Sequence, residues 1–309
     1  MTQPETWPRV AVIGAGAVGG YFGGIMARTG ASVVMIGRPA FVEAVNAKGL
    51  FLDTAKFQEM VRVEASSELS AVRGADIVLF CVKTTDTAAT ARELATFLSP
   101  AAVVVSLQNG VDNVEQIRAA SGIDPIGTVV YVGAAAPEPG RVRLLGRGDL
   151  VIGPETERTI RLAAQFVRCG VPCRVSHNIE GELWTKFVIN CALNAASALG
   201  QAKYGRIAES ADGRQLLRSI VEEMMAVATA ANLTLPSMEN SEAACAVVMS
   251  IATQMPEQLS STGQDLKRGK RTEIDSLNGY VARRGAELGV PTPVNQALYT
   301  LVKLAEGQP

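Results

Sequence analysis

Residues 9–28 read RVAVIGAGAVGGYFGGIMAR, and this stretch decides the fold class of the 309-residue chain. Val10 to Gly14 is an apolar run that ends in glycine, which predicts a buried strand and a turn. The uncharged stretch from Val10 to Ala27 also has the length of a membrane span or signal peptide. Six of its 18 residues are glycines, a density that disfavours a spanning helix. We therefore interpret it as strand, turn and helix.

The turn in this stretch has the spacing G-x-G-x-x-G. Gly14 permits the tight turn, Gly16 lets a pyrophosphate approach the backbone, and Gly19 lets the helix pack closely on the sheet. Glycine-rich turns occur for other reasons too, but a strand before and a helix after favour dinucleotide binding. The residues expected at the cofactor are Gly14, Ala15, Gly16, Ala17, Val18 and Gly19.

Short apolar runs alternate with helix-length segments as far as residue 153. Continuous apolar runs are typical of strands buried on both faces of a parallel sheet, so we predict a doubly wound α/β sheet of the Rossmann type. A late hairpin is predicted over 141–145 with its turn at 146–148, and 159–169 and 171–175 should complete the sheet. The predicted strands are 9–14, 32–36, 75–82, 102–107, 126–132 and 150–153, and the helices are 17–29, 41–48, 87–98 and 113–120.

After about residue 178 the strand pattern stops and long helical stretches follow. They are 180–199, 213–231, 239–255 and 272–288, with prolines at their boundaries. The sequence thus predicts two domains. Residues 1–178 form the dinucleotide-binding α/β domain, and residues 179–309 form an all-α domain.

The composition excludes several function classes. Lys and Arg total 29 against 30 Asp and Glu, so no charge excess favours nucleic acid. The five cysteines are scattered and His177 is the one histidine, so neither a metal site nor a mechanism with two imidazoles is expected. We expect a cytoplasmic protein that acts on a small molecule, without nucleic-acid or membrane partners.

The end of the second predicted strand indicates which dinucleotide is bound. NAD enzymes place a carboxylate there for the ribose 2′-hydroxyl, whereas this chain has Ile36-Gly37-Arg38. A guanidinium at this point suits the 2′-phosphate of NADP. The alternative is a surface arginine at the start of a loop.

Two further strand ends carry polar side chains. Lys83 follows the run 75–82, and Asn109 follows the run 102–107. The carboxyl ends of parallel strands meet at the edge where ligands bind, so both side chains are expected at one site. Asn109-Gly110 is also a good turn, but turn chemistry does not explain Lys83.

The helix predicted over 180–199 carries the clearest pattern in the second half. Lys186, Asn190 and Asn194 stand at i, i+4 and i+8, which places them within about 80° of arc and about 12 Å on one face. The flanking residues are apolar, and buried polar groups are costly without partners. We interpret this stripe as a substrate site. The alternative is an amide ladder bonded to a neighbouring helix.

Together these residues resemble the ketopantoate reductase family (2-dehydropantoate 2-reductases) over nearly the whole chain. The match includes the glycine turn, Gly37-Arg38, Val82-Lys83-Thr84, Gln108-Asn109-Gly110, the Lys186 helix and Thr272-Glu273-Ile274-Asp275. The resemblance implies an active site between a Rossmann domain and a helical domain. It also implies NADPH-dependent reduction of 2-dehydropantoate to (R)-pantoate in pantothenate and coenzyme A biosynthesis.

The resemblance further implies residue roles. Lys186 is the general acid, and Glu273 is a second catalytic group that also lies at the cofactor. Asn109, Asn190, Asn194 and Ser261 hold the substrate, and Arg38, Lys83, Asn109 and Ala134 contact the cofactor. Ser260 is an alternative to Ser261, although the spacing to Glu273 favours Ser261. From periodicity alone, these serines and Glu273 are first of all helix caps and surface partners.

Two other functions stay open at this point. A related NAD(P)-dependent reductase of another 2-oxo or hydroxy acid would share the fold and the lysine. A non-catalytic dinucleotide sensor would predict loss of the Lys186, Asn190 and Asn194 stripe, which is intact. The sequence pattern does not determine the oligomeric state. A homodimer is one possible assembly.

Overall fold

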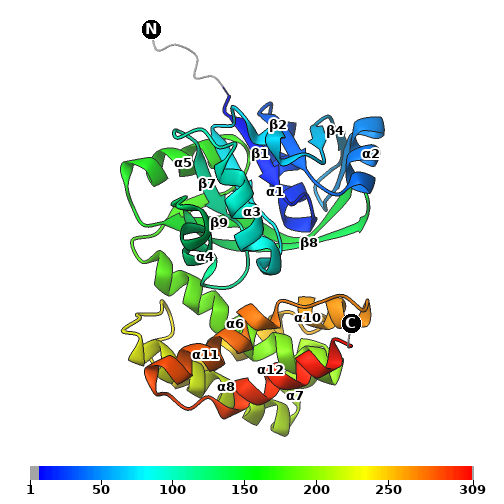
Figure 1. Ribbon diagram of the computed structural model, residues 1–309. Helices are drawn as coiled ribbons and strands as arrows, with labels where there is room; N and C mark the ends of the chain where they lie inside the picture. Colours follow the sequence, from blue (N-terminus) through cyan, green and yellow to red (C-terminus); the bar gives the residue numbers. More distant parts are fainter. Residues whose placement is uncertain (1–6, 308–309) are drawn as a thin grey trace. The chain divides into compact units, whose positions relative to one another are not determined.

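The computed structural model describes residues 7–307. The chain divides into two compact units, Met1–Ile179 and Glu180–Pro309. Figure 1 colours the first unit from blue to green and the second from green to red.

The first unit is built on a five-stranded parallel sheet with the strand order β5-β2-β1-β6-β7. This order, with helices on both faces, confirms the predicted Rossmann-type fold. The strands are β1 (Arg9–Ile13), β2 (Ser32–Ile36), β5 (Glu64–Ser66), β6 (Ile77–Phe80) and β7 (Val103–Ser106). The helices are α1 (Ala17–Arg28), α2 (Pro39–Lys48), α3 (Thr87–Ala95) and α4 (Asn113–Ser121), with 3-10 helices η1 (Leu69–Val72) and η2 (Thr84–Asp86).

Both faces of this sheet are buried, which explains why its strands read as continuous apolar runs. Val10 and Val12 of β1 belong to the core that contains Phe22 of α1. Ala11 and Ile13 belong to the core on the other face, which α3 and α4 cover side by side (Figure 1). Alternate side chains of one strand therefore enter two different cores.

A second sheet has the order β10-β9-β3-β4, with β8 paired to β9. Its strands are β3 (Leu50–Asp53), β4 (Gln58–Val61), β8 (Gly127–Glu138), β9 (Arg141–Gly153) and β10 (Cys173–Val175), and α5 (Glu157–Arg168) precedes β10. Helix α1 lies between the two sheets. A Cβ on Gly23 would come within 2.7 Å of Met35, and one on Gly24 within 2.8 Å of Leu52. The glycines of α1 are therefore explained by close packing on two sides.

Two predictions about this region are wrong, the position of the hairpin turn and the sheet to which the later strands belong, and three short strands were not predicted. The hairpin turn lies at Pro139-Gly140, where Gly140 has φ +76°, and not at 146–148. Residues 146–148 lie inside β9, where skipped residues create bulges opposite β8. The predicted strands 126–132, 150–153 and 171–175 correspond to β8, β9 and β10 of the second sheet, although Ile126, just before β8, bridges to Val105 of β7. The strands β3, β4 and β5 were not predicted, because three or four residues of mixed polarity carry no periodic pattern.

The second unit is helical throughout its described part, as predicted. Its helices are α6 (Ile179–Gly200), α7 (Tyr204–Glu209), α8 (Ala211–Ala230), α9 (Ser241–Gln254), α10 (Ser261–Lys267), α11 (Asn278–Leu288) and α12 (Pro293–Ala305). The predicted single helix over 272–288 is wrong, because a 3-10 helix η3 (Ile274–Ser276) precedes α11 and Leu277 separates them. Across residues 7–307, no helix has both the length and the apolar character to cross a membrane.

Candidate active site

The glycine turn lies at the carboxyl edge of the first sheet, between β1 and α1. Gly14 has φ +90°, and a Cβ there would lie 2.7 Å from the carbonyl oxygen of Cys81. The N–H groups of Gly14 and Ala15 donate to the carbonyl of Ile36 at 3.0 and 3.1 Å. These contacts hold the turn against the ends of β2 and β6, the neighbours of β1 in the sheet. Only glycine meets both requirements at this position.

Gly16 and Gly19 occupy different surroundings. Apart from Gly16 itself and its two chain neighbours, no heavy atom of the described residues lies within 4 Å of the position that a Cβ on Gly16 would take. A Cβ on Gly19 would meet the carbonyl oxygen of Gly14 and lie 2.8 Å from Val12. Helix α1 begins beside this open space, without a side-chain cap and without an acidic residue in its first turn. An unobstructed helix N-terminus of this kind fits a pyrophosphate.

Arg38 lies at the neighbouring strand end. It precedes α2 and its side chain is exposed. Within residues 7–307 its guanidinium forms no ion pair or hydrogen bond. Since β1 and β2 are adjacent and parallel, Arg38 and the glycine turn lie at the same edge of the sheet.

Gln108 joins two loops at this edge, and the sequence analysis assigned it no role. Its Nε2 donates to the carbonyl of Val82 at 3.0 Å and to the hydroxyl of Thr87 at 2.7 Å, while its Oε1 accepts from Ser106. Gln108 is buried, so these bonds are shielded from water. They connect the loop that carries Lys83 to the loop that carries Asn109. An amide directly after a buried strand is the signal that could have identified it.

The structure places the remaining residues of the first unit as follows. Lys83 is exposed just before η2. Asn109 is half-buried, and its carbonyl accepts from the Nδ2 of Asn113 at 2.6 Å. Ala134 lies inside β8, opposite Leu144 of the second sheet, and not at an end of the parallel strands. Lys83 and Asn109 therefore share the edge of the glycine turn, whereas Ala134 belongs to the other sheet.

In the second unit, α6 carries the predicted polar stripe. Lys186 and Asn190 are half-buried and Asn194 is buried. Away from the stripe, Trp184 and Phe187 pack edge-to-face with ring centroids 5.4 Å apart, and both also pack edge-to-face against Tyr280 of α11. These aromatic contacts fix the rotation of α6 about its axis.

The two asparagines of the stripe differ in their bonding. The side-chain amide of Asn190 has no hydrogen-bond partner among residues 7–307. The Oδ1 of Asn194 accepts from the hydroxyl of Tyr204 at 3.3 Å, while its Nδ2 makes no hydrogen bond in the described chain. Hydrogen bonding to a neighbouring helix, the alternative interpretation of the stripe, therefore explains the Oδ1 of Asn194. It does not explain the Nδ2 of Asn194 or the amide of Asn190.

The two candidate serines have different surroundings. Ser260 is fully buried, donates to the carbonyl of Asn194 at 3.0 Å and accepts from the N–H of Gly263. Its hydroxyl caps α10 and joins that helix to α6. Ser261 is exposed at the start of α10. Between the two, Ser261 is the serine whose hydroxyl is accessible.

Glu273 is half-buried and directly precedes η3. Its neighbours Thr272 and Asp275 are bonded to the C-terminal part of α12 and to Glu306, which directly follows that helix.

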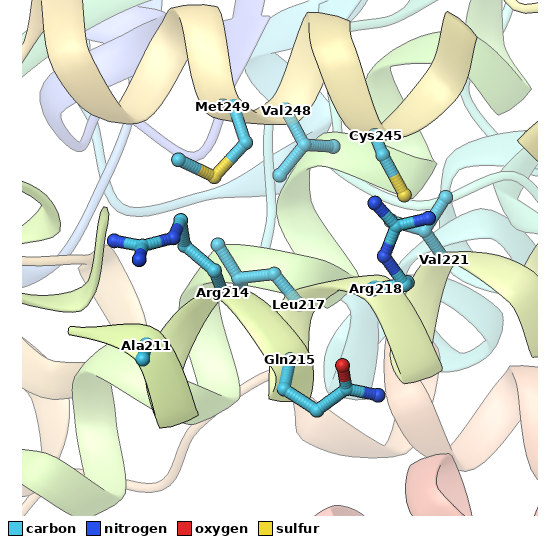
Figure 2. A pocket seen from close by; sticks show the side chains of 9 residues that line it. All are labelled: Ala211, Arg214, Gln215, Leu217, Arg218, Val221, Cys245, Val248 and Met249. Atoms are coloured by element: carbon cyan, nitrogen blue, oxygen red, sulfur yellow. The ribbon is translucent and has the colours of Figure 1, made fainter. Parts of the chain in front are cut away.

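A pocket of about 290 Å³ lies between α8 and α9 (Figure 2). Figure 2 shows the Arg218 side chain reaching from α8 toward Cys245 of α9. None of the predicted site residues lines this pocket, so it is separate from the candidate site. Its lining residues are Ala211, Arg214, Gln215, Leu217, Arg218, Val221, Cys245, Val248 and Met249.

The fold and these residues define a class, namely an oxidoreductase with a dinucleotide-binding Rossmann unit and a helical unit. Residues 10–157 match the family described as "Ketopantoate reductase PanE/ApbA", and residues 178–306 match "Ketopantoate reductase PanE/ApbA C terminal". The chain belongs to the ketopantoate reductase PanE/ApbA family.

Individual relatives agree with this membership. The 2-dehydropantoate 2-reductase of Halobacterium salinarum is 32% identical over 96% of this chain and 99% of its own length. The structure of a PanE/ApbA family ketopantoate reductase from Ralstonia eutropha has a TM-score of 0.92 at 48% identity, covering 96% of this chain and 98% of that one. A D-mandelate dehydrogenase solved with NADH has a TM-score of 0.88 at 23% identity, with 96% and 98% covered, and shares the fold.

Proposed function

We propose that this protein reduces 2-dehydropantoate to (R)-pantoate with NADPH, in the cytoplasm. The observation that carries the proposal is the stripe on α6, where Asn190 and the Nδ2 of Asn194 lack partners in the described chain. Desolvating such amides is costly unless a ligand satisfies them. Full-length relatives named 2-dehydropantoate 2-reductase support this substrate.

Two features of the first unit support a bound nicotinamide dinucleotide, and the second of them favours NADPH over NADH. The space beside Gly16 suits a pyrophosphate at the start of α1. Arg38 stands where an NAD enzyme carries a carboxylate, and it lacks a protein anion as partner within residues 7–307. Bound NADPH would supply the hydride. Gln108 holds together the loops of Lys83 and Asn109, which we assign to the cofactor and to the substrate next to the nicotinamide.

The chain's own residues would perform the rest of the reaction. Reduction of a ketone develops negative charge on its oxygen, and a proton must reach that atom. We assign this proton to the Nζ of Lys186, since an ammonium is charged at neutral pH, its reference pKa being about 10.4. We assign to the carboxylate of Glu273 the role of favouring the charged form of Lys186. Asn190, Asn194 and Ser261 supply donors for the carboxylate and hydroxyl of the substrate.

The test is NADPH oxidation by the purified protein with a panel of 2-oxo acids that includes 2-dehydropantoate. Lys186→Ala is expected to lower kcat by about 10²–10⁴-fold, the usual share of general acid catalysis, with NADPH affinity nearly unchanged. Lys203→Ala is the matched control, because Lys203 is an exposed lysine of the same unit that pairs with Glu257. Near-full kcat in Lys186→Ala would contradict the assignment. Higher kcat/KM for another 2-oxo acid would contradict the substrate.

A homodimer is the proposed assembly. Sedimentation of the purified protein at several concentrations tests it, and a monomer at all of them would contradict it.

A further inference from the structure

The segment 272–275, which carries Glu273, is bonded at its first residue to Glu306, the residue that directly follows α12. The N–H and the hydroxyl of Thr272 both donate to Oε1 of Glu306, at 2.8 and 2.6 Å. Thr272 is 1% exposed, and the side chain of Glu306 is 8% exposed. Charge-assisted hydrogen bonds that exclude water are among the stronger contacts in proteins.

At its last residue, Asp275, the segment is bonded to α12 itself. Asp275 accepts from the hydroxyl of Tyr299 at 3.0 Å and from the Nζ of Lys303 at 3.1 Å. Lys303 also pairs with Glu306 at 2.8 Å, so the four side chains form a continuous series whose two ends, Thr272 and Asp275, lie on the same segment. We call this series, Thr272–Glu306–Lys303–Asp275, the α12 clamp.

The directions of the pKa shifts in the clamp agree with its geometry. Partial burial opposes ionisation of Asp275 and Glu306, but hydrogen bonds from Lys303 and their other partners hold the pKa of both carboxyls below the ordinary value. The hydrogen bond to Glu306 raises the pKa of Lys303, and the bond to Asp275 raises it further. All three groups are therefore charged at neutral pH.

Glu273 is enclosed between the two bonded residues. The hydroxyl of Thr272 accepts from the N–H of Ile274 at 3.2 Å, across Glu273. The carbonyl of Glu273 accepts from the N–H of Ser276 at 3.0 Å. Local backbone bonds thus link Glu273 to Thr272 and Asp275, whose side chains are bonded to Glu306 and to α12. This arrangement also explains why the segment does not continue α11 as a regular helix.

We propose that Thr272, Asp275, Lys303 and Glu306 are positioning residues that hold Glu273 in the conformation used for reduction. This inference rests on the proposed function of Glu273. None of the four needs to touch the substrate, because each acts through the backbone of the 272–276 segment. Displacement of a catalytic group by about 1 Å is enough to lower a rate by about 100-fold.

The experiment compares Thr272→Val, Thr272→Ser and Glu306→Gln in the full-length protein. Thr272→Val keeps the shape of the side chain but removes the hydroxyl, whereas Thr272→Ser keeps the hydroxyl. Glu306→Gln keeps an oxygen that can accept from Thr272 and loses the charge that pairs with Lys303. Glu287→Gln is the control, because Glu287 pairs with Arg284 at 2.8 Å on the exposed surface of α11.

Two measurements are made on each variant: amide hydrogen exchange of residues 272–277, and kcat and KM with 2-dehydropantoate and NADPH. In Thr272→Val, exchange should be at least about tenfold faster in this segment alone, and kcat should fall by about 10- to 100-fold with unchanged NADPH affinity. In Thr272→Ser, the exchange rate and kcat should both stay close to those of the parent. Glu306→Gln should give intermediate values, and the control Glu287→Gln should match the parent.

The clamp is overturned if Thr272→Val keeps kcat within twofold of the parent, or if Thr272→Ser loses as much kcat as Thr272→Val. Faster exchange throughout the second unit would show a general loss of stability and would also overturn it. A parent protein inactive on every 2-oxo acid would contradict the proposed function instead. In that case unchanged exchange of residues 272–277 in Thr272→Val would still overturn the clamp.

Discussion

The hydroxyl of Tyr204 donates a hydrogen bond to the Oδ1 of Asn194 at 3.3 Å. Both residues are buried, and burial raises the pKa of Tyr204 to about 12, so its hydroxyl stays protonated. An asparagine amide has one acceptor oxygen and two N–H donors. Since Tyr204 bonds to the acceptor oxygen, the Nδ2 donors of the amide would be left for the proposed substrate. Tyr204 thereby orients the buried member of the α6 stripe.

Tyr204→Phe is expected to raise the KM for 2-dehydropantoate by roughly 2- to 10-fold, the effect of losing one hydrogen bond of about 0.5–1.5 kcal/mol. The ring of Phe fills the same space, so the thermal midpoint should change little. Steady-state kinetics at saturating NADPH measure the effect. An unchanged KM together with a lowered midpoint would show that the hydroxyl only stabilises the fold.

Gly16→Ala and Gly19→Ala should separate cofactor binding from stability. A Cβ on Gly16 meets no atom within 4 Å, so the variant should fold within about 3 °C of the parent, yet it narrows the proposed pyrophosphate space and should weaken NADPH binding. On Gly19 the same methyl meets the carbonyl of Gly14 and lies 2.8 Å from Val12. That clash should outweigh the roughly 1 kcal/mol of helix propensity gained. Thermal unfolding without ligand, followed by NADPH titration, checks both variants, and equal midpoints would contradict the packing role of Gly19.

Arg38→Ala should weaken NADPH binding by roughly 10- to 100-fold and leave NADH binding almost unchanged. A charge-assisted hydrogen bond to phosphate contributes about 1.5–3 kcal/mol, and only NADPH has the 2′-phosphate. Equilibrium titration with both nucleotides measures the difference. Arg62→Ala, an exposed arginine of the same unit, is the control. A parent protein that binds the two nucleotides equally would contradict the preference.

Asp53 should make stability depend on acid pH. It accepts from Arg141 and Arg143 of β9, each at 2.8 Å, and these hydrogen bonds lower its pKa from 3.8 to about 2. A carboxyl with a lowered pKa in the folded state stabilises the fold above its unfolded pKa, and this contribution is lost as pH falls toward the folded value. The free energy of unfolding of the parent should therefore decline between about pH 4 and pH 2. Asp53→Asn should be less stable at pH 7, with the difference narrowing across that range. Parallel pH curves for the two proteins would contradict this role.

The fold class could be predicted because its determinants are local. The glycine turn from Gly14 to Gly19 and the apolar strands around it specify their conformation within a few residues. The stripe of Lys186, Asn190 and Asn194 was visible for the same reason, since helix geometry alone places every fourth residue on one face. The placement of Lys83 and Asn109 at the carboxyl edge of the sheet then followed from the parallel direction of the strands.

The rest was decided by contacts between residues far apart in the chain. Strands β3 and β9 pair within the second sheet and are joined by Asp53 and Arg141, 88 positions apart. Thr272 and Glu306 are 34 positions apart, and their bonds hold a segment whose local pattern predicted a regular helix. The periodicity of apolar residues in the sequence shows which face of a helix or strand is apolar. It does not show which residue a polar side chain bonds to. Sequence alone therefore determined the fold class and the polar stripe. Tertiary structure decided which end of the Asn194 amide is left for a ligand and which residues bond to the segment of Glu273. The reason is that these hydrogen bonds join atoms that only folding brings together.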